Sequence, residues 1–234
     1  MRHLVSTLAL APLLIAQGRH VKRTVPHLAE PDGEREGVCG SGPLLRLLIV
    51  GDSAAAGVGA ASQDKALTGQ LLEQLKNHFQ VHWQLIAKTG ATTHDTLARL
   101  EHLSAQPFDV VVTSLGVNDV TAQRSLTQWR HQQGKLIALL ERKFSAQRIF
   151  LSGLPPMHRF PALPQPLRWY IGSRAKQFDR ALMRLALKRD RCEFVQLTYT
   201  AFTTDAMAKD GFHPGPAIYQ QWAKTLAQRI LKPT

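Results

Sequence analysis

A serine, a histidine and an aspartate in this 234-residue chain have the types and spacing that acyl transfer requires. Ser53 follows an apolar run and a Gly51-Asp52 pair, and Asp210 and His213 lie three residues apart near the C-terminus. A serine hydroxyl becomes a good nucleophile when a histidine accepts its proton, and a carboxylate then orients the histidine and stabilises its cation. We therefore expect Ser53 as nucleophile, His213 as general base and Asp210 as its acceptor.

The negative oxygen of a tetrahedral intermediate needs fixed hydrogen-bond donors, and losing one donor costs about 3 kcal/mol. The backbone N–H groups of Ser53 and Gly90 and the side-chain amide of Asn118 are candidates for this oxyanion hole. Each signal alone has an ordinary explanation, because turns and helix caps use glycine, asparagine and serine. Their order along the chain and their positions after predicted strands make coincidence the harder explanation.

The elements that position these residues follow from hydrophobic patterning. The run Leu44 to Val50, broken only by Arg46, is typical of a strand buried on both faces of a parallel sheet. Further strands are predicted at 81–87, 109–115, 148–154 and 193–199, and the segment 157–169 is expected to be irregular because it holds three prolines. Helices are predicted at 65–79, 93–103, 126–144, 169–189 and 216–231.

This alternation predicts an α/β fold with a five-stranded parallel sheet, right-handed crossovers and helices on both faces. The carboxyl ends of parallel strands lie at one edge of the sheet, where ligands bind in open α/β folds. The loops that carry Ser53, Gly90 and Asn118, and the loop before the last helix, are therefore expected to converge on one cleft. We assign residues 44–234 to a single domain.

The four blocks together resemble those of the SGNH hydrolase superfamily, also called GDSL-type esterases and lipases. The resemblance covers residues 44–231, and the ordered set is specific although no single block is. It implies a three-layer α/β/α fold with a flavodoxin-like sheet, and ester or thioester hydrolysis through an acyl-serine intermediate, with no metal or other cofactor. The blocks are Val50-Gly51-Asp52-Ser53, Lys88-Thr89-Gly90-Ala91-Thr92, Gly116-Val117-Asn118-Asp119 and Asp210-Gly211-Phe212-His213-Pro214.

The resemblance also assigns roles to neighbouring acidic residues. It makes Asp210, three residues before the histidine, the acidic member of the triad. Asp52 is expected to hold its turn by accepting backbone hydrogen bonds, and Asp119 is expected to stabilise a turn. One departure is Ala54, where the family motif has leucine, which predicts a roomier pocket near Ser53.

The substrate is less sharply defined by the sequence. Leu154, Met157 and Phe160 are candidate walls of an acyl pocket, with packing against the helices as the alternative. The sequence shows no long insertion that would form a lid, so we expect carboxylic esters with short to medium acyl chains. A lysophospholipase or an acyl thioesterase of the same fold is the alternative, and a sugar acetyl ester also remains open.

Composition excludes some function classes. The hydrophobic content of 44% and charged content of 20% are ordinary for a globular protein, while the net charge of +12 favours anionic partners. No nucleic-acid recognition motif or Walker loop is present, so nucleic-acid and nucleotide binding are not expected. Cys39 and Cys192 are far apart and outside any metal-binding spacing. A non-catalytic protein that binds a membrane or a polyanion remains the rival class.

The first 43 residues are expected to lie outside the domain. Residues 4–16 carry no charge, the basic cluster Arg19 to Arg23 follows, and residues 24–43 have the glycine and proline content of a linker. If residues 1–18 are a signal peptide, the protein is periplasmic or secreted. We favour an uncleaved segment that docks on the domain or contacts anionic headgroups through residues 4–23, giving a cytoplasmic protein or one peripheral to the inner membrane. The oligomeric state is left open.

Overall fold

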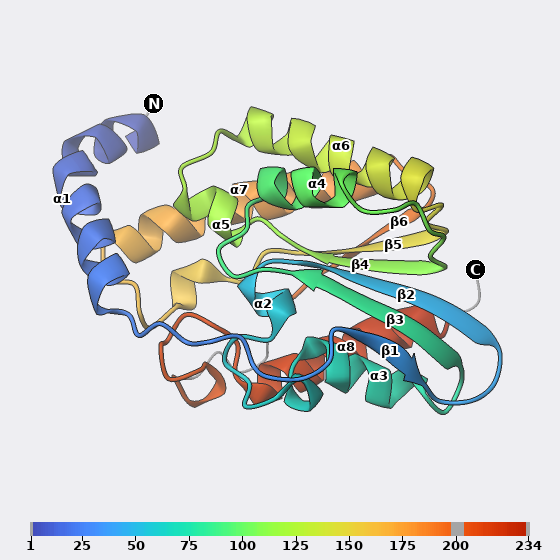
Figure 1. The fold of residues 1–234 in the computed structure, drawn as a ribbon. Coiled ribbons are helices and arrows are strands. Elements are labelled where there is room, and N and C mark those ends of the chain that lie inside the picture. The colour runs from blue at the N-terminus through green and yellow to red at the C-terminus, as the bar shows by residue number, and fades with distance from the viewer. Residues whose placement is uncertain (1, 198–203, 233–234) are drawn as a thin grey trace.

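The computed structural model describes residues 2–197 and 204–232 and forms a three-layer α/β/α sandwich (Figure 1). One layer consists of α3 (Leu67–Leu75) and α8 (Pro216–Ile230). The opposite layer consists of α4 (Thr93–Glu101), α5 (Val117–Thr121), α6 (Leu126–Lys143) and α7 (Leu167–Ala186). Short helical turns occur at α2 (Ser53–Ala56), η1 (Gln63–Lys65), η2 (Met157–Arg159) and η3 (Thr204–Ala206).

The central sheet has the strand order β1-β3-β2-β4-β5-β6. All neighbouring strands from β3 to β6 are parallel, and in chain order these five follow the flavodoxin-like arrangement 2-1-3-4-5. The predicted fold class is therefore confirmed, and the topological switch point lies between β2 and β4. The strands are β1 (Glu36–Cys39), β2 (Leu44–Gly51), β3 (Gln80–Ala87), β4 (Val110–Ser114), β5 (Arg148–Ser152) and β6 (Cys192–Val195).

Strand β2 explains why its sequence is a nearly continuous apolar run. Leu48 and Val50 belong to the core beneath α4, α6 and α7, whereas Leu47 and Ile49 belong to the core beneath α3 and α8. All four side chains are fully buried, so both faces of the strand need apolar residues. Arg46, the one interruption, pairs with Asp109 at the start of the strand.

Two expectations about the sheet need correction. The sheet has six strands, because β1 forms within the predicted linker and pairs antiparallel with β3, from Glu36 opposite Gln84 to Cys39 opposite Val81. The boundary at residue 43 is therefore not the edge of the sheet. The strand predicted at 193–199 ends at Val195, and its last two positions lie outside the described residues.

The N-terminal helix α1 (Arg2–Thr24) continues through Pro12 and docks on the domain beside α7. Leu14 is buried in the core, and the Gln17 side chain both donates to the Gln165 carbonyl and accepts from the Leu167 N–H. Helix α7 begins at Leu167, two residues earlier than predicted, with a proline at its N-cap. No helix in the described part of the chain is long and apolar enough to cross a membrane.

Candidate active site

Ser53 lies on the tight turn between β2 and α2, at the switch point of the sheet. The preceding residue, Asp52, caps α2: its carboxylate accepts a hydrogen bond from the Ala54 N–H at 3.1 Å, and its own N–H donates to the Ser114 carbonyl. Ser53 is the first residue of α2, and the first N–H groups of a helix have no intrahelical acceptor. The turn therefore presents both the hydroxyl and a free N–H of Ser53.

The loop before α8 brings His213 and Asp210 to this serine. His213 Nε2 lies 2.9 Å from Ser53 Oγ, and His213 Nδ1 lies 2.5 Å from Asp210 Oδ2. The other carboxylate oxygen of Asp210 accepts hydrogen bonds from the N–H groups of Phe212 and His213, each at 3.0 Å. These bonds fix the carboxylate, which in turn orients the imidazole toward Ser53.

Asp210 is suited to stabilise a cationic imidazole. Burial acts to raise the pKa of Asp210, but hydrogen bonds from the His213 ring and from two backbone N–H groups outweigh it and leave the pKa below its usual value. The Asp210 side chain is fully buried whereas His213 is 18% exposed. The carboxylate is therefore ionised at neutral pH and shielded, while the histidine reaches the cavity.

Asn118 lies at the first turn of α5, directly after β4. Its side-chain amide donates to the Ala91 carbonyl at 3.0 Å and to Asp52 Oδ2 at 3.5 Å. The second bond is at the outer limit of hydrogen-bond length, so this N–H is the more easily released of the two. Asn118 thus joins the turn that carries Ser53 to the loop that carries Gly90.

Gly90 has a positive φ of 80°, and an added Cβ would meet open space. Among the described residues, neither the Gly90 N–H nor the Ser53 N–H has an acceptor. Gly90 lines a polar cavity next to the site, together with Lys88 and Arg99. Both glycine and serine therefore retain a backbone donor available to a ligand.

Two buried carboxylates, those of Asp52 and Asp119, accept hydrogen bonds around Gly90 and Asn118. Asp119 Oδ2 accepts from the N–H and the hydroxyl of Thr93, and so fixes the start of α4 next to the Gly90 loop. Burial raises the pKa of Asp119 despite these bonds. Burial also raises the pKa of Asp52 to about 7, although the Ala54 N–H and nearby His213 act in the opposite direction.

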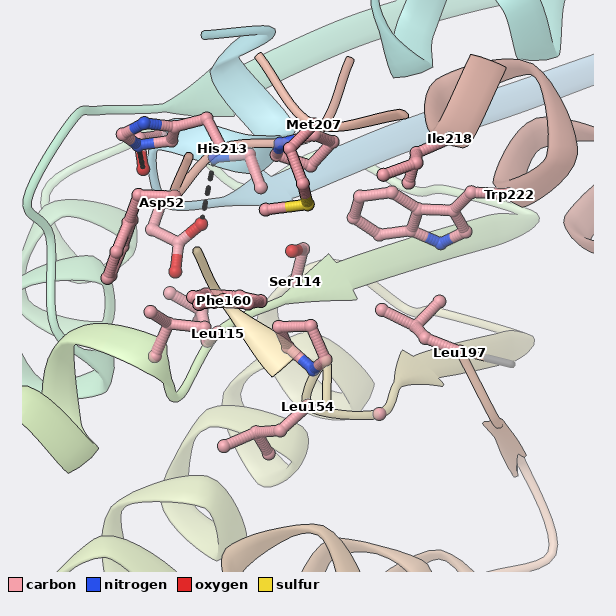
Figure 2. Close-up of a pocket in the computed structure, with 17 residues that line it drawn as sticks. Asp52, Ser114, Leu115, Leu154, Phe160, Leu197, Met207, His213, Ile218 and Trp222 are labelled. Atoms are coloured by element: carbon pink, nitrogen blue, oxygen red, sulfur yellow. Dashed lines mark hydrogen bonds between the residues drawn. The ribbon is translucent and has the colours of Figure 1, made fainter. Parts of the chain in front are cut away.

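Ser53 and His213 open onto an apolar cavity whose walls come from several loops and from α8 (Figure 2). Leu154 and Phe160 line it as expected from the sequence, and Phe160 packs edge-on against Phe212 beside His213. Met157 is instead fully buried in the core, so its assignment to the pocket is corrected. Further walls are Ser114, Leu115, Leu197, Met207, Ile218 and Trp222.

The sequence analysis missed these further walls, although α8 carries a signal for two of them. Ile218 and Trp222 are one helical turn apart and face inward, and the Trp222 indole donates to the Ser152 hydroxyl. Helical periodicity from the start of α8 would have placed both beside His213. Within the described residues no group of three or more His, Cys, Asp and Glu side chains is placed to hold a metal ion.

Comparison with known proteins identifies the family of this chain. Residues 49–221 match the GDSL-like lipase/acylhydrolase family. The chain belongs to this family. A similar protein is the GDSL-like esterase Rv1075c of Mycobacterium tuberculosis, which is 25% identical over 187 residues, covering 72% of this chain and 58% of that protein. The chain thus spans little more than half the length of this relative.

Solved structures share the fold at lower sequence identity. The lipase Lip_vut3 from a goat rumen metagenome is 17% identical with a TM-score of 0.63, covering 79% of this chain and 96% of its own. Axe2, an acetylxylan esterase from Geobacillus stearothermophilus, is 21% identical with a TM-score of 0.63, covering 83% and 96%. These likenesses establish the three-layer architecture.

Proposed function

We propose that this protein is a serine hydrolase that cleaves carboxylic esters through an acyl-serine intermediate. The observation that carries the proposal is the continuous hydrogen-bonded series Ser53, His213, Asp210 at the mouth of an apolar cavity. Membership of the GDSL-like lipase/acylhydrolase family supports the same chemistry.

In the proposed mechanism, Ser53 Oγ attacks the ester carbonyl while His213 Nε2 takes its proton, and Asp210 stabilises the imidazolium that forms. The N–H groups of Ser53 and Gly90 and the amide of Asn118 stabilise the negative oxygen. His213 then gives its proton to the departing alkoxide, which leaves as the alcohol. A water molecule, deprotonated by His213, attacks the acyl-serine and releases the carboxylic acid and free Ser53.

The size of the cavity supports a preference for acyl chains of short to medium length. Its free volume is about 40 Å³, small beside the ~300 Å³ or more of sites that hold drug-sized ligands. Its walls are mostly apolar, which suits an alkyl chain better than a charged group. We expect kcat/KM for p-nitrophenyl esters to peak at acetate to hexanoate. A peak at long acyl chains, or at lysophospholipid or acyl thioester substrates, would transfer the proposal to those activities.

The chain offers a matched control for the nucleophile, because Ser114 lines the same cavity without a bond to His213 in the described structure. Hydrolysis of p-nitrophenyl acetate should fall by at least about 10⁴-fold in S53A, because no other group can form the acyl intermediate. In S114A it should remain within about tenfold of wild type. Equal loss in the two variants would contradict the assignment of Ser53.

A further inference from the structure

Helix α1 carries apolar side chains that the domain does not cover. Leu14 is buried against the core, but Leu13 and Ile15 on either side of it are 46% and 55% exposed. Exposed large apolar residues on a helix that is already docked have no evident use in the domain itself. They lie on the two flanks of the docked Leu14, and Ile15 shares one exposed face of α1 with Arg19 and Lys22, four and seven residues further on.

A basic cluster follows on the Ile15 face, toward the C-terminal end of the helix. Arg19, Lys22 and Arg23 are all exposed, and among the described residues none of them has an ion-pair partner. The chain as a whole carries a net charge of +12. Exposed apolar side chains next to unpaired cations are the combination that binds the interface of an anionic bilayer.

Helix α1 also lies at the edge of the molecule where the active-site loops emerge (Figure 1). Its Gln17 binds the backbone of Gln165 and Leu167, at the end of the segment that follows β5. The same segment supplies Leu154 and Phe160 to the cavity wall. The segment between β5 and α7 therefore contacts α1 at one end and lines the cavity at the other.

We propose that α1 is an in-plane anchor that binds the surface of an anionic phospholipid bilayer. Ile15 enters the headgroup boundary, with Leu13 at the margin of the contact, while Arg19, Lys22 and Arg23 bind lipid phosphates. Binding holds the carboxyl edge of the sheet, and with it the cavity, close to the membrane. This last consequence rests on the proposed esterase function and implies amphiphilic esters that partition into membranes as substrates. The membrane binding itself does not depend on catalysis.

The test is co-sedimentation of the full chain with vesicles of phosphatidylcholine, alone or with 30% phosphatidylglycerol. Wild type should bind the anionic vesicles at least about tenfold more tightly than the neutral ones. R19Q/K22Q/R23Q should lose at least about tenfold on anionic vesicles, since each surface cation contributes roughly fivefold. Its control, R130Q/K188Q/K224Q, removes three exposed cations elsewhere and should lose less than about threefold.

The apolar half of the proposal has its own matched pair. L13E/I15E should lose vesicle binding, whereas M183E/L187E, which places two glutamates on exposed apolar positions in the last turn and at the C-cap of α7, should retain it. Hydrolysis of soluble p-nitrophenyl acetate by both variants should match wild type, which shows that they are folded. Equal vesicle binding by both pairs would overturn the proposal.

A second outcome that would overturn it is self-association through α1. Light scattering should give the same molar mass for wild type and L13E/I15E. A dimer that L13E/I15E converts to a monomer, with vesicle binding unchanged, would assign these exposed positions of α1 to contact with a second copy of the chain. Vesicle binding by a protein that hydrolyses no ester would leave the anchor standing and overturn the enzymatic function alone.

Discussion

The two sides of the active site are built in different ways. On one side, Ser53, His213 and Asp210 are joined by direct side-chain hydrogen bonds of 2.9 and 2.5 Å. On the other side, the connection to Ser53 is indirect. The Asn118 amide donates to the carbonyl of Ala91, next to Gly90, and to the carboxylate of Asp52, next to Ser53. In the proposed mechanism, the proton-transfer side is thus complete in the free protein. On the oxyanion side, the Asn118 N–H must leave Asp52 before it can join the N–H groups of Ser53 and Gly90.

The difference follows from what each side must do. Proton transfer needs a fixed donor and acceptor, so a single loop that carries both Asp210 and His213 is enough. Oxyanion stabilisation needs donors from several strand ends aimed at one point, and buried Asp52 and Asp119 hold those strand ends together. We therefore expect changes on the two sides to differ in size and in kind.

The largest effect among the supporting residues is expected for D210N. The amide cannot stabilise the imidazolium and favours the wrong histidine tautomer, so kcat should fall by about 10³ to 10⁴-fold with KM little changed. Steady-state kinetics on p-nitrophenyl butyrate measures both constants. A fall of less than tenfold would show that the direct hydrogen-bond series is not what activates Ser53.

The next effect is expected on the oxyanion side, for N118A. Loss of one donor to the negative oxygen should lower kcat by about 10² to 10³-fold. Because the bond forms mainly in the transition state, KM should stay within a few-fold of wild type. A rise in KM with unchanged kcat would instead mean that Asn118 only positions the Ala91 carbonyl and the substrate.

A third test concerns the buried carboxylate that joins the two sides. Burial raises the pKa of Asp52 from its ordinary value of 3.8 to about 7 in the folded protein. The folded state therefore binds this proton more tightly than the unfolded state and loses stability as pH rises from about 4 to about 7. The D52N variant does not lose stability in this way, because an asparagine side chain does not titrate in this pH range. Relative to wild type, its free energy of unfolding should therefore rise by up to about 4 kcal/mol between pH 4 and pH 8.

Urea unfolding at a series of pH values measures this difference directly. Other carboxylates titrate in both proteins, so subtraction isolates Asp52 as far as the sites act independently. A difference that does not change with pH would mean that Asp52 stays ionised when folded, and that its link to Asn118 is an ordinary charge-assisted bond.

The smallest effect is expected at Gly90, where only backbone conformation is at issue. An added Cβ meets no atom within 4 Å at Gly90 or at Gly134 in α6, but only Gly90 has a positive φ. G90A should cost about 1 kcal/mol of stability and lower kcat a few-fold, whereas G134A should gain up to about 1 kcal/mol. Thermal unfolding of the two variants makes the comparison. Equal shifts would contradict the conformational argument.

Much of the fold could be predicted because β2, β4 and β5 are short apolar runs with helices between them. Parallel strands joined by helices place their carboxyl ends at a single edge, which gathers Ser53 and Asn118, whereas the order of the strands is implied only by the family resemblance. Strand β1 gave no such signal, since it is four residues long, exposed and contains Gly37. It forms because β3 offers an unpaired edge, a tertiary cause that local patterning cannot reveal.

The candidate site shows the same division. Ser53, Gly90, Asn118, Asp210 and His213 follow from residue type and position after strands. The cavity walls do not, because an apolar side chain in a loop can face either core or cavity: Phe160 lines the cavity while Met157, three residues earlier, is in the core. That choice depends on packing against residues distant in sequence, such as Phe212, which Phe160 contacts edge-on.

The most direct test of the account is covalent labelling of wild type with a fluorophosphonate, followed by mass spectrometry of the modified peptide. An activated serine attacks the phosphorus and expels fluoride, so one label per chain should appear on Ser53, with none on Ser114 in the same cavity. Labelling should disappear in S53A and slow markedly in D210N. Folded wild type that remains unlabelled, or carries its label on Ser114, would contradict the central claim that His213 and Asp210 activate Ser53.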